Sequence, residues 1–387
     1  LSKGRTRYVW CKTYARSLCI VNRSILYLLN TMTAEISTQE LSYPFGEELP
    51  DFGQLKQVHP DLYWMRLPLP FALDHINVWL LRDEFAGQDG WTLIDTGVAR
   101  PEQKAIWQSV FQQGLQGLPI VRVLVTHMHP DHVGLAGWLC RHWQAPLWMS
   151  KTDYMVASLW AEPSTASAHH RLGQLSAAYY QRHGLSDAQR LAEIGQRDSY
   201  YADLVTPLPA SFNRLMHGDR IQIGACQWQA IAGYGHAPEH ISLWCPQANV
   251  LISGDMVLPR ISTNVSVHAY EPEANPLALY LRSLNEFAAV DEQALVLPSH
   301  GRPFHGVHVR IREQQAHHQA RLQETLQACQ SKEGLSAAEL VPLMFKRKLD
   351  THQLTFAMGE AIAHLHFLYH EGRIERRLVD GVYRFYA

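Results

Sequence analysis

The feature that most constrains this chain is an apolar run followed at once by three histidines and an aspartate. Residues 121–125 are mostly β-branched and apolar, which indicates a buried strand. A short loop then carries His127, His129, Asp131 and His132 within six positions. Alternate residues of an extended segment project to the same side, so His127 and His129 can share one metal ion. Asp131 and His132 lie beyond the turn and can face a second. Imidazole and carboxylate suit Zn²⁺, with Fe or Mn as alternatives.

The alternative interpretation of this loop is a histidine-rich surface segment, because the chain contains 22 histidines. The pattern His-x-His-x-Asp-His is, however, too specific to arise often by chance at that frequency. After an apolar strand it resembles the signature of the metallo-β-lactamase superfamily. The resemblance implies an α/β (α+β) fold, a four-layer αββα sandwich with a binuclear metal site at one edge, and further ligands downstream.

Four further positions, one before the loop and three after it, match the pattern of that family. Asp95 stands in an Asp-x-Gly sequence after an expected strand, and the resemblance makes it a residue that orients the metal loop rather than a ligand. His236 follows a glycine, Asp255 lies in a Gly-Asp pair, and His300 lies in Pro-Ser-His-Gly, where Ser299 replaces a family glycine. By the resemblance, one metal is held by His127, His129 and His236, the other by Asp131, His132 and His300, and Asp255 bridges them.

The resemblance also implies a mechanism in which a hydroxide bridged between two metals, two Zn²⁺ in the first instance, is available near pH 7. Asp131 would orient the water or accept its proton, so Asp131 and Asp255 are candidate catalytic residues as well as ligands. A bridging carboxylate is similar to the hydrolases of thioesters, lactones and phosphodiesters in the superfamily. The true β-lactamases differ at this position, so we expect weak lactam cleavage. The full ligand set argues for two metals and against a mononuclear iron dioxygenase.

Composition divides the chain into three parts. Residues 1–31 are basic and contain no acidic residue, and we predict an N-terminal extension outside the fold, with a transit-type presequence or a membrane-surface helix as alternatives. Residues 32–308 are predicted to form the metallo-β-lactamase-like catalytic domain, with a helical insert at about 153–205. Residues 309–387 read as three helices and a terminal hairpin, which suggests a C-terminal winged-helix-like domain.

Periodicity and turn residues predict most of the individual elements. In the first half we expect strands at 62–67, 76–81 and 91–94, the last two joined by a turn at Asp89–Gly90, and helices at 101–113 and 135–143. In the second half we expect strands at 218–223, 226–231, 241–244, 250–253 and 295–297. The tail is expected to hold helices at 311–330, 336–348 and 356–370 and a hairpin that turns at Asp380–Gly381.

The helical insert is a candidate lid or pocket wall near the metals. It contains three histidines, for which surface or packed positions are more typical than substrate contact. The same holds for its aromatic side chains, which we expect to pack. The histidines are His169, His170 and His183, and the aromatic residues are Tyr154, Trp160, Tyr179 and Tyr180.

Charge and cysteine content restrict the setting. The formal net charge is −2, so no strong field favours a membrane or nucleic acid. The six cysteines show no CxxC spacing and fit reduced thiols in a cytoplasmic protein. No apolar run has the length of a membrane span, so we expect no membrane partner.

The substrate is less constrained than the chemistry. The first hypothesis is a hydrolase of a small-molecule acyl ester, thioester or lactone, with Phe71, Trp79 and Tyr270 as candidates for an apolar pocket. No residue is assigned to substrate binding. A non-enzymatic, metal-bound binding module is a further alternative, against which the intact ligand set argues.

The second hypothesis is a single-stranded RNA or DNA endonuclease of the winged-tail type. It needs a basic track, for which the candidates are Arg260 and the arginines of the terminal hairpin, Arg373, Arg376, Arg377 and Arg384. The long insertion typical of RNA-processing members is not apparent. Nucleic acid is therefore not favoured as a partner, and we expect the tail to serve packing or formation of a homodimer.

Overall fold

The computed structural model describes residues 40–71, 73–161, 172–197, 199–331 and 333–387, and residues 41–387 form one compact unit. The predictions for residues 1–31 and for His169 and His170 lie outside the described residues. Among the described residues, no helix combines the length and the hydropathy that crossing a bilayer would require.

The first sheet has seven strands in chain order. Its first four strands are antiparallel, and β4, β5, β6 and β7 then pair in parallel. The parallel pairs bring the carboxyl ends of β4 and β5 to the same edge, where the metal loop begins. The strands are β1 (Lys56–His59), β2 (Leu62–Pro68), β3 (His75–Phe85), β4 (Gln88–Ile94), β5 (Ile120–Leu124), β6 (Leu147–Met149) and β7 (Asn213–Arg214).

The second sheet has five strands in the order β12-β11-β10-β9-β8. Only β11 and β12 pair in parallel, so their carboxyl ends also share one edge. The strands are β8 (Arg220–Ile223), β9 (Cys226–Gly233), β10 (His240–Cys245), β11 (Val250–Gly254) and β12 (Leu295–Pro298).

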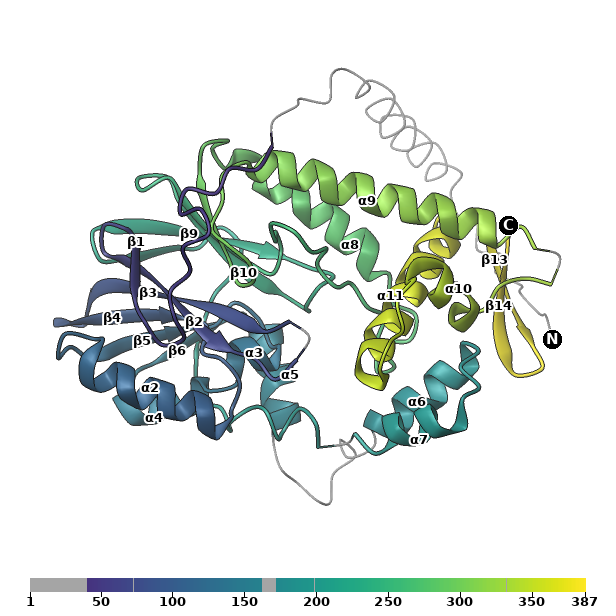
Figure 1. Cartoon of the computed structure of the whole chain (residues 1–387), viewed down its shortest axis with the longest axis horizontal. Helices are drawn as coiled ribbons and strands as arrows, with labels where there is room; N and C mark the ends of the chain where they lie inside the picture. The colour runs from purple at the N-terminus through teal and green to yellow at the C-terminus, as the bar shows by residue number, and fades with distance from the viewer. Residues whose placement is uncertain (1–39, 72, 162–171, 198, 332) are drawn as a thin grey trace, which may run out of the picture. The chain divides into compact units, whose positions relative to one another are not determined.

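Alternating side chains place the two sheets face to face. Trp64 and Trp79 on the first sheet stack at 6.2 Å and share one buried cluster with Ile241 and Leu243 of the second. Helices α2 (Pro101–Gln113) and α4 (Ala136–Trp143) pack on the outer face of the first sheet, and α8 (Pro276–Ser283) and α9 (Val307–Ala328) on that of the second. Figure 1 shows these four layers, which confirm the predicted αββα sandwich.

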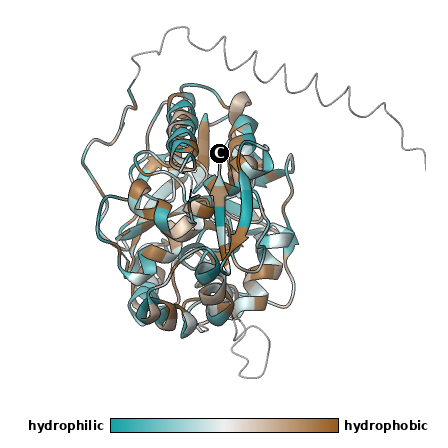
Figure 2. Ribbon diagram, turned by 90° about the vertical axis from the view of Figure 1, so that its right-hand side faces the viewer, coloured by the Kyte–Doolittle hydropathy of each residue, from teal (hydrophilic) through white to brown (hydrophobic). Residues whose placement is uncertain are grey.

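The predicted helical insert contains α5 (Lys151–Ala161), α6 (Leu172–Arg182) and α7 (Ala188–Gly195). The tail contains α10 (Ala337–Met344), α11 (Thr351–His370) and the hairpin β13 (Glu375–Val379) and β14 (Val382–Tyr386). A capping box between Ser336 and Glu339 starts α10 as expected. Figure 2 looks onto this end of the molecule, with hydrophobic and hydrophilic residues along the hairpin. The boundary at residue 309 and the winged-helix interpretation stay predictions.

Two expectations for the first sheet are wrong. The β3–β4 turn lies at Ala86–Gly87, both with positive φ, and not at Asp89–Gly90, because Phe85 pairs with Gln88 and the ladder continues past Gly90. Gly90 serves a close approach instead, since a Cβ there would lie 2.5 Å from the carbonyl oxygen of Pro119. Trp79 is fully buried between the sheets and cannot line a pocket.

Candidate metal centre

All seven residues predicted as ligands come from strand ends at one edge of the sandwich. His127 and His129 lie in the loop after β5, and the one-turn helix α3 (Pro130–Val133) carries the next pair. The other three follow β9, β11 and β12 of the second sheet. The structure brings all seven residues together: His127, His129, Asp131, His132, His236, Asp255 and His300.

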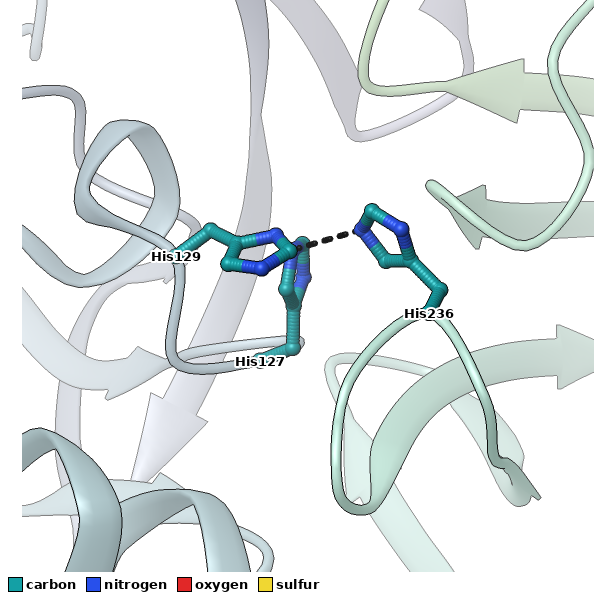
Figure 3. Close-up of side chains that lie close together, drawn as sticks. All are labelled: His127, His129 and His236. Carbon is teal, nitrogen blue, oxygen red and sulfur yellow. Dashed lines mark hydrogen bonds between the residues drawn. The ribbon is translucent and has the colours of Figure 1, made fainter. Parts of the chain in front are cut away.

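The first group of side chains consists of His127, His129 and His236. The Nε2 atom of His127 lies 2.8 Å from Nδ1 of His129 and 3.2 Å from Nε2 of His236. Figure 3 shows the three imidazoles pointing toward one another from two separate loops. Nitrogens this close to one another, in a mostly buried position, form a set that a single cation can satisfy.

The second group consists of Asp131, His132 and His300. Oδ2 of Asp131 lies 3.6 Å from Nε2 of His132 and 3.4 Å from Nε2 of His300. Asp255 lies between the two groups: its Oδ2 is 3.3 Å from Nε2 of His236 and 3.6 Å from that of His132, and its Oδ1 is 3.5 Å from that of His300.

Hydrogen bonds determine which ring nitrogen of three of the histidines faces the centre. Nδ1 of His236 donates to the carbonyl of Asn264 at 2.7 Å, and Nδ1 of His300 donates to the carbonyl of His75 at 2.8 Å. Nδ1 of His127 lies 3.0 Å from Oγ1 of Thr126. Because these outer nitrogens have partners, the Nε2 atoms of His127, His236 and His300 are left to bind a cation.

Asp95 holds the base of the metal loop. Its carboxylate accepts the backbone N–H of Thr126 at 2.8 Å, the Thr126 hydroxyl at 2.8 Å and Nδ1 of His132 at 2.8 Å. Its own backbone has φ +61°, a conformation that aspartate tolerates better than most residues. The side chain thus orients one histidine and the loop, as the family pattern implies.

The unpaired buried polar atoms of this cluster and the charges of its side chains both fit a bound cation. Nε2 of His132 and Oδ1 of Asp255 are buried and have no hydrogen-bond partner among the described residues. Burial opposes ionisation of Asp131, yet His132 and His300 hold its pKa at about 2. Burial likewise opposes protonation of His300, but Asp255 and Asp131 raise its pKa to about 10. The carboxylates of Asp131, partly exposed, and Asp255, buried, therefore need positive charge beside them, which divalent cations would supply in place of these protons.

Gly254 and Ser299 directly precede Asp255 and His300 in the chain. Gly254 has φ +56°, and a Cβ there would meet Nε2 of His240 at 2.2 Å. That imidazole accepts the backbone N–H of Asp255 at 3.1 Å and so positions the next residue. Ser299 is absent from the positive-φ residues, so its replacement of a family glycine needs no left-handed backbone.

Sequence reasoning missed Asp153, on the first turn of α5. Its buried carboxylate accepts the backbone N–H of Met128 at 2.7 Å and that of Glu239 at 2.6 Å. It thereby joins the two loops that carry His127 and His236. Burial raises its pKa to about 6, although both backbone bonds oppose the shift. An aspartate at a helix start gives no signal of this role in a single sequence.

The remaining candidates lie in different places. Phe71 is partly buried and stacks on His352 of α11 at 5.6 Å, and Tyr270 is 41% exposed and stacks on His268 at 5.1 Å. His183 is buried against Tyr179, and both of its ring nitrogens lack a partner among the described residues, so it is a core residue.

Comparison with known families agrees with this geometry. The sequence profile described as the metallo-beta-lactamase superfamily matches residues 72–342, and the profile of a metallo-beta-lactamase-like C-terminal domain matches residues 322–387. The fold and the histidine–aspartate cluster define a metal-dependent hydrolase enzyme. The chain belongs to the metallo-beta-lactamase superfamily.

Individual relatives extend over most of the chain. The chain is similar to the probable metallo-hydrolase YqjP of Bacillus subtilis, with 24% identity over 80% of this chain and 92% of that protein. A crystal structure of a beta-lactamase domain protein from Burkholderia ambifaria is 50% identical, covers 89% of this chain and 98% of its own, and has a TM-score of 0.82. A metallo-beta-lactamase family protein from Thermus thermophilus is 27% identical, with coverage of 85% and 99% and a TM-score of 0.69.

Proposed function

We propose that this enzyme hydrolyses a small-molecule acyl ester, thioester or lactone with two divalent cations, Zn²⁺ in the first instance. The observation that carries the proposal is the position of Asp255, whose Oδ2 lies near both His236 and His132 and whose Oδ1 lies near His300, so that it contacts both groups of side chains. A carboxylate so placed suits a bridge between two cations. Bound there, two cations would lower the pKa of a shared water and polarise the scissile carbonyl.

The protein's own residues have separate roles in this proposal. His127, His129 and His236 would hold one cation, and Asp131, His132 and His300 the other. Asp131 is partly exposed, whereas His132 is fully buried. The Asp131 carboxylate is therefore the ligand best placed to orient an incoming water or to accept a proton from that water. Asp95 and Asp153 would keep the ligands in place.

The charge distribution of the tail supports a small substrate rather than a nucleic acid. Each of the hairpin arginines named as a candidate basic track has a carboxylate partner: Arg373 with Glu371, Arg376 with Glu273, Arg377 with Glu375 and Arg384 with Glu339. A carboxylate beside each arginine offsets its positive charge, so these arginines attract phosphate less than unpaired ones would. The nuclease hypothesis thus retains Arg260 alone among its candidates.

The cysteines support a cytoplasmic site of action. Cys140, Cys226, Cys245 and Cys329 are free thiols. Free thiols, three of them buried, suit a reducing compartment better than an oxidising one.

The test is an activity panel on one zinc-loaded preparation with its metal content measured. The panel holds acyl and aryl thioesters, lactones, bis-p-nitrophenyl phosphate, single-stranded RNA and a cephalosporin. We expect about two zinc ions per chain and turnover of an ester, thioester or lactone, with weak action on the cephalosporin. Preferential cleavage of RNA with a steep salt dependence would replace this proposal by the nuclease hypothesis.

A further inference from the structure

The last residues of the helical insert lie along the loop that carries His127 and His129. The hydroxyl of Tyr201 donates to the carbonyl of Met128, between the first two histidines of the centre. Further on, the carbonyl of Leu204 accepts the backbone N–H of Ala99 at 2.8 Å, and the N–H of Thr206 donates to Gly134 at 2.7 Å. Residues just before Tyr201 are therefore held beside the candidate metal centre.

Aromatic side chains from three separate segments meet next to this segment. Tyr200 lies 5.5 Å from the ring of His352, which also stacks on Phe71 at 5.6 Å and contacts Phe356 at 5.0 Å. We call these four side chains the aromatic cluster. Tyr200 is 37% exposed and Phe356 44%, so the cluster presents planar rings to solvent instead of closing into the core.

The C-terminal helix α11 supplies half of the aromatic cluster and is fixed to the insert at its first turns. A guanidinium nitrogen of Arg190 donates to the carbonyl of Leu349 at 3.0 Å, and the hydroxyl of Tyr180 donates to that of Thr355 at 3.2 Å. Glu193 accepts the hydroxyl of Thr351. These bonds keep His352 and Phe356 in place relative to Tyr200.

Arg197 lies beside the aromatic cluster, and Arg100 precedes α2 next to the segment that carries Tyr200, because the N–H of the adjacent Ala99 donates to Leu204. Nη1 of Arg197 lies 3.4 Å from Nδ1 of His352, and within the described part of the chain neither it nor the exposed Arg100 forms an ion pair. Glu193, one turn before Arg197, is occupied by Thr351 and Gln189 instead.

The pKa of Tyr200 is shifted by burial and by nearby charges. Burial raises it to about 12, the charge of Asp131 adds to the rise, and Arg197 and Arg100 oppose it. Burial and Arg197 lower the pKa of His352, so it contributes a neutral ring near pH 7.

We propose that Arg197 and Arg100, with the rings of Tyr200, His352 and Phe71, form a binding site for an anionic group of the substrate. The substrate would then be an acyl ester or thioester whose part remote from the scissile bond carries negative charge and a planar ring. Guanidinium groups bind phosphate and carboxylate through paired hydrogen bonds, and exposed aromatic rings stack on planar groups. This inference rests on the proposed function and narrows its substrate class.

The site fits a small anion better than a polymer. A nucleic acid contacts a protein through a row of phosphates, which needs cations spaced along a track. Here Arg197 lies at His352 of the aromatic cluster and Arg100 next to the segment that carries Tyr200, and the arginines of the terminal hairpin are already paired. The site therefore has the extent of one anionic group.

The test compares two thioesters with the same acyl group. Butyryl-coenzyme A carries phosphates and a planar base, whereas the butyryl thioester of N-acetylcysteamine carries neither. For Arg197→Glu and Arg100→Glu we expect kcat/KM for the coenzyme A thioester to fall by about tenfold or more each, mainly through KM. The uncharged thioester should change by less than about twofold. Arg312→Glu, at an exposed position on α9, is the matched control and should affect neither substrate.

A second measurement separates this inference from the proposed function. The affinity for desulfo-coenzyme A, which lacks the thiol, is measured by calorimetry in the zinc-loaded wild type and in both variants. Loss of binding in the variants supports the site even if no thioester is hydrolysed, which would count against the proposed function alone. Equal binding in all proteins, or equal loss of activity on both thioesters, overturns the site and leaves the hydrolase proposal standing. The site is also overturned if Arg197→Glu and Arg100→Glu affect only RNA cleavage.

Discussion

The carboxylate of Asp153 accepts the backbone N–H of Met128 at 2.7 Å, and its other oxygen reaches the N–H of Glu239. One buried side chain thus sets the spacing between the loop of His127 and His129 and the loop of His236. We predict that Asp153→Asn, which offers one acceptor oxygen in place of two, lowers zinc affinity or kcat by about 10- to 100-fold while the chain stays folded. Titration with a competing chelator measures the affinity.

A matched control for this change is Asp187→Asn. Asp187 also accepts a backbone N–H, that of Arg190 at 3.1 Å, but at the exposed start of α7. The variant Asp187→Asn should leave zinc affinity unchanged. If both variants bind zinc like the wild type, Asp153 does not position the loops.

Removal of a ligand should abolish turnover without unfolding the chain. His129→Ala is expected to lower the zinc content to about one ion per chain or less and to eliminate detectable hydrolysis. Asp255→Ala should do the same, because the carboxylate faces both groups of ligands. Elemental analysis, circular dichroism and rates on the best substrate give the readouts, and the half-exposed His217→Ala serves as control. Full activity of metal-depleted His129→Ala would contradict the proposed chemistry.

Acid should destabilise the packing of the helical insert against the terminal hairpin through His183, which is buried without charge against Tyr383 and Phe385. Burial lowers the pKa of His183 to about 3, well below the 6.5 of an exposed imidazole. The unfolded chain therefore binds a proton between these values while the folded chain does not, so stability is lost as pH falls below about 6.5. At pH 5 the loss from this one group is about 2 kcal/mol.

The variant His183→Phe tests this pH dependence. Its imidazole packs against aromatic rings and has no hydrogen-bond partner among the described residues, so phenylalanine can replace it. The difference in melting temperature between pH 7.5 and pH 5 should shrink in the variant and stay unchanged in His217→Phe. An unchanged difference in His183→Phe would show that the imidazole is charged, or solvated, in the folded state.

A buried ion pair at the other end of the sandwich should matter for stability rather than catalysis. Nε of Arg122 donates to Asp83 at 2.9 Å, and Asp83 also accepts the hydroxyl of Thr92 and the N–H of Gly224. Arg122→Met leaves a buried carboxylate without its cation and should cost about 3–5 kcal/mol. Denaturant unfolding measures this loss.

The exposed pair of Arg377 with Glu375 provides the comparison for Arg122, since Arg377→Met breaks an ion pair in water. It should not move the unfolding midpoint measurably. A similarly small effect of Arg122→Met would mean that water reaches the Asp83 carboxylate.

Much of the metal centre was predictable because ligands are side chains in a fixed local pattern. His127, His129, Asp131 and His132 are close in sequence, and the family pattern located His236, Asp255 and His300 after strands. Among the groups that orient them, Asp95 was predicted from the family pattern, but the others were not predictable. Asn264 and His75 act through backbone carbonyls, which every residue has, so the sequence carries no signal for them.

The errors in the fold have a similar physical origin. Asp89–Gly90 has the composition of a hairpin turn, but strand pairing extends beyond it and Gly90 is needed where the backbone of Pro119 approaches. Trp79 is as apolar as a pocket residue, but the pairing of β2 with β3 places it beside Trp64, and the second sheet buries both. Local composition predicts the type of an element better than the environment of its side chains.

The contact between His127 and His236 has a consequence for how the chain folds. Their Nε2 atoms lie 3.2 Å apart although 109 positions separate them in the sequence. A contact of this range forms only after the two sheets have docked, because a long loop must close first. In a refolding experiment, helical and strand signals should therefore recover before zinc binding does, and the metal would report the arrival of the native arrangement.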